Sequence, residues 1–326
     1  MDIKSFAEII KVANTITLTT HLIPDPDGIG SMVALGYALQ AKRKKVRLLL
    51  EEKLYEKYHY LDPRGLIHSI CEKDITKKQD LFIVLDANSI HRVGERIKKI
   101  QEYSEETFFI DHHPCAPELR FLNLIDTSYA ATGELVADLI DDMDTPLTKE
   151  IALALYTAIL IDTSSFNYPT IKGRTHRIIA KLLESGISSK EAFQKINSLK
   201  DISSIHLLGR VLSRASVSGQ VAFTHVTKKD LDQFNTPLEE SFGLINHLIH
   251  LNDILVVCLF IELSPKSTKV SFRSFKNIDV GLIAQQLGGG GHTYSAATVI
   301  PNSISATKNI VIKKLDALLN EIKGTK

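Results

Sequence analysis

The sequence predicts a two-domain α/β protein whose larger N-terminal part contains a parallel β-sheet covered by helices on both faces. In the first half, short β-branched runs alternate with amphipathic stretches, which is the pattern of strands joined by crossover helices. A second, smaller alternation of strands and helices begins near Gly219. The chain has 326 residues, which is enough for two domains of roughly 100–200 residues each.

The first half supplies the elements of the parallel sheet. Apolar, β-branched runs predict strands, and apolar residues at helical spacing predict helices. The expected strands cover residues 16–20, 46–50, 81–85, 108–110 and 122–125, and the expected helices cover residues 31–42, 132–140 and 149–160. In a parallel sheet of this kind, ligands bind beyond the carboxyl ends of the strands.

The pattern of strands and helices changes after about residue 185. We expect a first domain over residues 1–185, a helical linker with serine-rich breaks over 186–214, and a second domain over 215–326. Within the second domain the expected strands cover residues 220–224, 253–262 and 267–274, and the expected helices cover residues 280–287 and 306–322.

Composition and charge exclude several classes of protein. The 39 Lys and Arg residues nearly balance the 38 Asp and Glu residues, which argues against a protein that coats long nucleic acid through global positive charge. The three cysteines lack metal-binding spacing, so a reducing, cytoplasmic compartment is expected. The longest apolar run, residues 151–161, is too short to span a bilayer, and the N-terminus lacks the apolar core of a signal peptide.

Carboxylate and imidazole side chains follow the ends of several apolar runs. These residues are His21, Asp25 and Asp27 after the first run, Asp86 after the third, Asp111-His112-His113 after the fourth, and Asp162 after an apolar segment that ends at Ile161. Each alone has an ordinary alternative, such as a proline-containing turn or a helix cap. Carboxylates that converge without a cation would repel and raise each other's pKa. Asp and His ligands without thiolate suit a harder first-row ion such as manganese.

The ordered combination resembles the DHH phosphoesterase superfamily. It comprises His-x-x-x-Asp-x-Asp-Gly over residues 21–28, Asp86, Asp-His-His over 111–113, and Asp162. Phe272-Arg273-Ser274, the glycines over 288–291, His292 and Ala296-Ala297 resemble the family's C-terminal substrate-binding domain. The order and spacing are similar to those of the nanoRNases, which hydrolyse short oligoribonucleotides and 3′-phosphoadenosine 5′-phosphate. The resemblance implies a Rossmann-like N-terminal domain followed by a smaller α/β domain.

The resemblance also implies roles for the N-terminal residues. One manganese ion would be held by His21, Asp25 and Asp86, and a second by Asp27, Asp86, His112 and Asp162, with Asp86 bridging the two. His113 would act on the substrate as an acid or electrostatic stabiliser, and Asp111 would orient a ligand imidazole. A hydroxide activated by the two metal ions would attack the phosphorus in line, as in other two-metal phosphoesterases.

In the second domain, the resemblance implies residues that bind the substrate's phosphate. The residues concerned are Arg273, Ser274, Gly289, Gly290, Gly291 and His292. A glycine run lets backbone approach a phosphate closely, and arginine can bind phosphate with two parallel hydrogen bonds. A flexible turn and a solvated strand arginine remain the alternatives. Thr132-Gly133-Glu134, Ser89 and Arg92 also look family-like, but we assign them no catalytic role, and for Thr132-Gly133-Glu134 a helix start is the ordinary interpretation.

Two positions depart from the family pattern. Pro26 stands where many relatives have a small flexible residue, and it stiffens the loop without removing a ligand. Thr298 stands where relatives often carry glycine, which puts the fine substrate contacts in question.

The expected function is that of a manganese-dependent hydrolase of short oligoribonucleotides and nucleotide bisphosphates. A linear or cyclic dinucleotide phosphodiesterase, an inorganic pyrophosphatase and a non-catalytic nucleotide-binding protein are the alternatives. The chain has no Trp, and its one dense basic run is residues 42–45, so neither long duplexes nor membranes are expected partners. A homodimer is left open.

Overall fold

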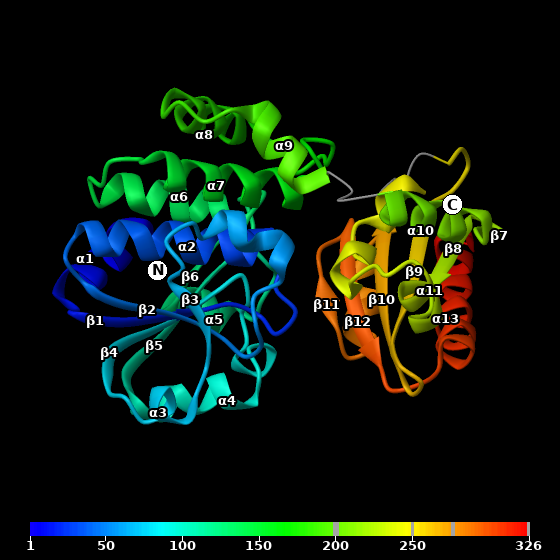
Figure 1. Ribbon diagram of the computed structural model, residues 1–326, viewed down its shortest axis with the longest axis horizontal. Helices are drawn as coiled ribbons and strands as arrows, with labels where there is room; N and C mark the ends of the chain where they lie inside the picture. Colours follow the sequence, from blue (N-terminus) through cyan, green and yellow to red (C-terminus); the bar gives the residue numbers. More distant parts are fainter. Residues whose placement is uncertain (198–201, 249–250, 275–277, 325–326) are drawn as a thin grey trace. The chain divides into compact units, whose positions relative to one another are not determined.

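The computed structural model of the protein describes residues 1–197, 202–248, 251–274 and 278–324 (Figure 1). The chain divides into two compact units, Met1–Ser198 and Leu199–Lys326. Both units are α/β, which confirms the predicted fold class. None of the helices in the described ranges has the length and apolar character needed to cross a lipid bilayer.

The first unit contains a six-stranded sheet in the order β3-β2-β1-β4-β5-β6. All neighbouring strands pair in parallel, as the alternating pattern predicted. The strands are β1 (Thr15–Thr19), β2 (Lys45–Leu50), β3 (Ile67–Ser69), β4 (Gln79–Leu85), β5 (Ser104–Asp111) and β6 (Leu124–Ile125). Alternate residues of β4 enter two cores on opposite faces of the sheet, with Ile83 on one side and Phe82 on the other.

Helices cover both faces of this sheet (Figure 1). One face carries α1 (Ile3–Val12), α2 (Pro26–Ala41), α6 (Thr132–Asp142) and α7 (Lys149–Asp162), and the other carries α3 (Glu72–Ile75) and α4 (Glu95–Lys98). The helix α5 (Pro117–Leu122) precedes β6, while α8 (Gly173–Glu184) and α9 (Ser189–Asn197) pack against α7. Short 3-10 helices cover Glu56–Leu61, Ile90–Arg92 and Lys99–Tyr103.

The start of α2 corrects a sequence prediction. A helix was expected from residue 31, but α2 begins at Pro26. The Asp25 side chain caps it by accepting hydrogen bonds from the amides of Asp27 and Gly28, and proline is well suited to the first helical position. The proline that indicated a turn therefore begins the helix, and this places Asp27 in its first turn.

The second unit contains a mixed six-stranded sheet in the order β11-β12-β10-β9-β8-β7. Its strands are β7 (Ser216–Ser218), β8 (Val221–Val226), β9 (Val256–Ser264), β10 (Ser267–Ser274), β11 (Gly290–Gly291) and β12 (Ser295–Ile300). Its helices are α10 (Ile202–Ser213), α11 (Lys228–Gln233), α12 (Val280–Gln286) and α13 (Ile304–Gly324), with 3-10 turns over Leu238–Ser241 and Leu244–His247. Only β8 and β9 pair in parallel among these strands. The predicted helical stretch over 186–214 contains α9 and α10, and α8 was not predicted.

Candidate active site

The candidate metal ligands meet at the carboxyl edge of the first sheet. His21 lies two residues beyond β1, Asp86 directly follows β4, and Asp111 is the last residue of β5. These three strands are adjacent and parallel, so their ends lie side by side. Asp162 is the last residue of the helix α7, which corresponds to the helix expected over residues 149–160. Its carboxylate still joins the group, with Oδ2 3.2 Å from Nε2 of His112.

Within the described part of the chain, three overlapping groups of ligand atoms contain Asp86: one is Asp86, Asp111 and His113, and the two others correspond to the expected metal positions. The first of these two is His21, Asp25 and Asp86, the second is Asp27, Asp86 and His112, and within each group the ligand atoms lie within 4.8 Å of one another. Nε2 of His21 is 3.4 Å from Oδ2 of Asp86, and Nε2 of His112 is 3.9 Å from Oδ1 of the same carboxylate. One carboxylate that faces both groups is the natural bridge between two cations. The donor set of oxygens and imidazole nitrogens fits divalent metal ions.

Asp27 is fully buried and is held by the start of α6. Its Oδ2 accepts a hydrogen bond from the amide of Thr132 at 2.8 Å, and its Oδ1 accepts from the amide of Gly133 at 2.9 Å. The hydroxyl of Thr132 donates to Oδ1 of Asp86 at 3.0 Å. A Cβ at position 133 would lie 2.7 Å from that of Ala158, so glycine lets α6 approach. Sequence reasoning noted Thr132-Gly133 but did not assign this role, because the same letters also fit an ordinary helix start.

Asp86 occupies a strained backbone conformation. Its φ angle is +57°, a left-handed value that is uncommon for residues other than glycine. The amide of Asp86 donates to the carbonyl of Ile110 on the neighbouring strand at 2.9 Å. Strain of this kind persists where the surroundings hold it and clusters at functional sites. Here it turns the carboxylate toward both groups of ligands.

Asp111 makes a different contact from the one expected. Its Oδ1 accepts a hydrogen bond from Nδ1 of His113 at 2.6 Å and another from the backbone amide of His112 at 2.8 Å. The imidazole of His112 instead lies with Nδ1 3.3 Å from the carbonyl oxygen of Tyr129. Asp111 therefore orients the ring of His113, while the backbone of Tyr129 orients the candidate ligand imidazole.

Burial and crowding shift the protonation of this cluster. Burial raises the pKa of Asp27 well above its usual value, and the charges of Asp86 and Asp162 raise it further. Burial alone would lower the pKa of His21, but hydrogen bonds to Asp25 and Asp86 raise it to about 9. Burial lowers the pKa of His113 well below its usual value. Carboxylates crowded in this way are stabilised by cations, which relieve their mutual repulsion.

In the second unit, Arg273 and Ser274 end the strand β10. The guanidinium of Arg273 donates to the adjacent carbonyl of Phe272 at 2.9 Å and is partly exposed. Ser274 is buried, with its hydroxyl 2.6 Å from the carbonyl oxygen of Ile278 and 2.8 Å from that of Thr293. The structure thus shows Ser274 bonded to the protein backbone, so a contact with substrate would require its hydroxyl to leave those partners.

Some glycines of the run are required by close backbone contacts, whereas Gly290 has free space beside its Cα atom. A Cβ at Gly289 would lie 2.2 Å from the carbonyl oxygen of Ala297, and one at Gly291 would lie 2.4 Å from Cα of Ala296. These two glycines let β11 pair closely with β12. Around Gly290 no atom lies within 4 Å of such a Cβ. His292 follows directly and closes the turn, its amide donating to the carbonyl of Ser295 at 2.7 Å. The backbone at Gly290 could therefore be approached by a ligand.

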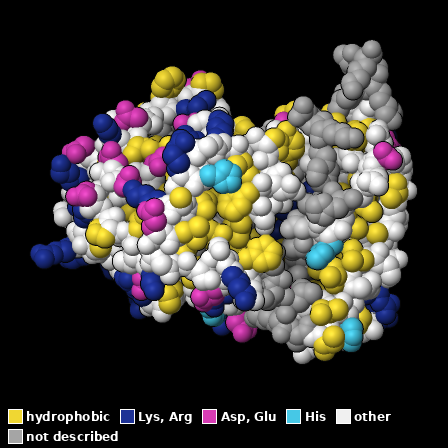
Figure 2. Space-filling model, turned by 90° about the horizontal axis from the view of Figure 1, so that it is seen from above, with side chains coloured by type: hydrophobic (Ala, Val, Ile, Leu, Met, Phe, Trp, Pro, Cys, Tyr) yellow, Lys and Arg dark blue, Asp and Glu magenta, His cyan; other side chains and the backbone are white. Residues whose placement is uncertain are grey.

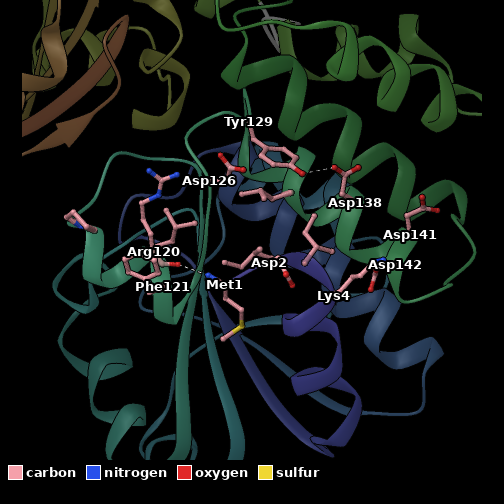
Figure 3. Close-up of a pocket in the computed structure, with 15 residues that line it drawn as sticks. Met1, Asp2, Lys4, Arg120, Phe121, Asp126, Tyr129, Asp138, Asp141 and Asp142 are labelled. Atoms are coloured by element: carbon pink, nitrogen blue, oxygen red, sulfur yellow. Dashed lines mark hydrogen bonds between the residues drawn. The ribbon is translucent and has the colours of Figure 1, made fainter.

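A cavity of about 890 Å³ lies beside the N-terminus and α6 (Figure 3). Among the described residues that line it there is none of the candidate metal ligands. It borders the site through Tyr129, whose hydroxyl donates to Oδ2 of Asp138 at 2.8 Å (Figure 3). The candidate metal ligands and this cavity are therefore separate features.

Comparison with known proteins decides the family. The model of the DHH family, N-terminal domain, matches residues 15–159, and the model of the DHHA1 domain matches residues 217–325. The protein MG371 of Mycoplasma genitalium is 31% identical over 91% of this chain and 90% of its own length. The chain belongs to the DHH family. Members of this family hydrolyse phosphoester bonds with the help of divalent metal ions, so the chain is a hydrolase of this type, as predicted.

Other relatives also match most of this chain. The "Bifunctional oligoribonuclease and PAP phosphatase NrnA" of Thermus thermophilus is 29% identical, covering 90% of this chain and 87% of its own. The protein of the same name from Bacillus subtilis is 26% identical, covering 96% and 97%. An exopolyphosphatase-related protein from Bacteroides fragilis has the same fold, with a TM-score of 0.84 and 24% identity over 99% of this chain and 96% of its own.

Proposed function

We propose that this DHH hydrolase degrades oligoribonucleotides of a few nucleotides and dephosphorylates 3′-phosphoadenosine 5′-phosphate. The observation that carries the proposal is the pair of overlapping ligand groups that share Asp86, an arrangement suited to two metal ions about 3.5–4 Å apart. The substrate class is supported by the names of the relatives from Thermus thermophilus and Bacillus subtilis. A linear or cyclic dinucleotide would be the competing substrate at the same site.

The proposed ligands divide between two positions. His21, Asp25 and Asp86 form the first, and Asp27, Asp86, His112 and Asp162 form the second, with manganese as the proposed metal. Bound divalent cations lower the pKa of water and neutralise phosphoryl oxygens. Asp86 holds the two positions together, and the amides of Thr132 and Gly133 keep the carboxylate of Asp27 in place.

His113 is the proposed residue for the scissile phosphate. Its Nδ1 donates to Asp111 at 2.6 Å, which fixes the plane of the ring. We propose that Nε2 contacts the phosphate and delivers a proton to the leaving oxygen. Burial lowers the pKa of His113 in the ligand-free protein, and the negative charge of a bound phosphate would raise that pKa again.

The second unit is proposed to recognise the substrate's terminal phosphate. Arg273 supplies charge, His292 supplies an imidazole, and the backbone of Gly290 is open to a ligand. Gly289, Gly291 and Ser274 would shape this region, since each is engaged by the fold itself.

A substrate panel tests the proposed function. The protein is incubated in Mn²⁺, and separately in Mg²⁺, with 5′-labelled oligoribonucleotides from two to twenty-four nucleotides, 3′-phosphoadenosine 5′-phosphate, and linear and cyclic dinucleotides. We expect the shortest RNAs and the bisphosphate to be hydrolysed fastest, and Mn²⁺ to support the higher rates. Hydrolysis confined to dinucleotides, linear or cyclic, without hydrolysis of longer RNAs or the bisphosphate, would favour the competing function.

A further inference from the structure

Residues 128–134, here called the β6–α6 segment, contact ligands of the proposed second metal position. The carbonyl oxygen of Tyr129 lies 3.3 Å from Nδ1 of His112. The amides of Thr132 and Gly133 donate to the carboxylate of Asp27. The hydroxyl of Thr132 also donates to Asp86, so this segment contacts three of the proposed ligands. In the tautomer that donates Nδ1–H to Tyr129, the His112 ring presents Nε2 as a metal ligand.

The outer side of the same segment is held by Arg174, which lies in the first turn of α8. Its guanidinium carbon is 3.5 Å from the centroid of the Tyr129 ring. Its Nη2 also donates a hydrogen bond to the carbonyl of Ser128 at 2.8 Å. A planar guanidinium can stack on a ring and donate in its own plane at the same time, which a lysine ammonium cannot reproduce. Arg174 thus holds two consecutive residues of the segment.

Glu134 contacts the same segment from the protein interior. It is fully buried, and its Oε2 accepts a hydrogen bond from the amide of Ala130 at 3.1 Å. The same oxygen lies 3.9 Å from Nε of Arg174. A buried carboxylate is costly unless it is compensated by hydrogen bonds and an opposite charge. Glu134 and Arg174 together clamp the segment between Ser128 and Ala130.

We propose that Arg174 and Glu134 are positioning residues that set the metal affinity of the second position, formed by Asp27, Asp86, His112 and Asp162. They act through the Tyr129 carbonyl and the start of α6. The first position has further supports outside the segment, because Asp25 is held by amides of α2 and His21 lies against Asp25 and Asp86. The segment reaches this position only at the shared ligand, through the Thr132 hydroxyl on Asp86. The proposal rests on the two-metal function above and goes beyond it by separating the two positions.

The test is calorimetric titration of the metal-stripped 326-residue chain with Mn²⁺. The wild-type chain is expected to bind two ions. Arg174→Ala should bind one ion with unchanged affinity and the other roughly 10- to 100-fold more weakly, the usual effect of losing a residue that orients a ligand. Arg177→Ala is the matched control, since Arg177 is exposed on the same helix, and it should bind both ions normally.

A second variant keeps the proposal testable if Arg174→Ala does not fold. Tyr129→Leu removes the stacked ring but keeps the backbone carbonyl, and it should weaken the same single ion. In the double variant the two losses should add only in part, because both single variants remove the stacking of Arg174 on Tyr129. Wild-type affinity for both ions in a folded Arg174→Ala or Tyr129→Leu protein would overturn the inference. If the wild-type chain itself bound no Mn²⁺, the proposed two-metal function would fail instead.

Discussion

In the first unit, the candidate metal ligands come from residues far apart along the chain, whereas in the second unit the candidate phosphate-binding residues come from two short segments, the end of β10 and the glycine run with His292. The Asp27 carboxylate is buried and takes three hydrogen bonds, from Ser31, Thr132 and Gly133. Arg273 is partly exposed and opposes Ser295 in the pairing of β10 with β12. The first arrangement holds charged groups in fixed places. The second presents main-chain groups and the partly exposed guanidinium of Arg273. This contrast suggests chemistry in one unit and recognition in the other.

The strongest test of this contrast is Asp86→Ala. Loss of the proposed bridging carboxylate should lower the hydrolysis rate by at least about 10³, because both metal positions lose a ligand. The rate in Mn²⁺ is measured on a short oligoribonucleotide. The matched control is Asp80→Ala near the opposite end of β4, where the carboxylate accepts from the amides of Asn14 and Thr15; this variant should lose stability and keep its rate while folded. A tenth of wild-type rate in Asp86→Ala would disprove the bridging role.

The second test separates recognition from chemistry. Arg273→Ala and His292→Ala should each reduce hydrolysis of nucleotide substrates about 10- to 100-fold, the effect of losing a charge-assisted contact of roughly 1.5–3 kcal/mol. A small artificial phosphodiester that reaches only the metal ions should be hydrolysed almost normally. Equal losses on both substrates would contradict the division of labour.

Gly290→Ala refines the same comparison without a charge change. Its Cβ would meet no atom within 4 Å, so the fold should tolerate it, while the nucleotide KM should rise several-fold if a phosphate approaches this backbone. Gly289→Ala provides the contrast, since its Cβ would lie 2.2 Å from a carbonyl oxygen, and it should lower the melting temperature. A Gly290→Ala protein with unchanged KM would remove Gly290 from the proposed site.

A stability test addresses the second unit by itself. Burial would raise the pKa of Asp230, but hydrogen bonds from Arg214 and Thr227 lower it to about 2. Since the folded-state pKa is below the unfolded value of 3.8, the carboxylate stabilises the unit above about pH 4 and loses this effect as pH falls toward 2. Asp230→Asn should cost about 2 kcal/mol near neutral pH. Denaturant titrations at several pH values check this, with the exposed Asp232→Asn as control; an unchanged pH profile would contradict it.

Substrate length should give the smallest effect. Lys and Arg lie intermixed with Asp and Glu on the face of the first unit shown in Figure 2, and the net charge is +1. Nucleotides beyond the first few should therefore add little affinity, and their ordering opposes binding. Two- to five-nucleotide RNAs should be degraded faster than a twenty-four-nucleotide RNA, with no steep salt dependence. A preference for the long strand that grows as salt is lowered would reveal an extended binding track.

Much of this arrangement was predictable because its signals are local. The run over residues 81–85 and the Asp86 that follows are neighbours in the chain, and β-branched periodicity identifies such strand ends directly. The start of α2 was missed because Asp25 and Pro26 fit both a turn and a capped helix. The helix expected over residues 149–160 was found as α7, because apolar residues that continue over more than about ten positions favour a buried helix over a strand.

The α/β fold, the DHH family and the types of ligand that approach the edge of the first sheet could all be inferred from the order of residues. How those ligands are held became visible only in the folded chain. Thr132 reaches Asp86 across 46 residues, and Gly133 reaches Asp27 across 106. Such contacts depend on how α6 packs beside α2, which no local pattern in the chain records. The same holds for Arg174 on Tyr129, since stacking between distant segments is set by packing and not by periodicity.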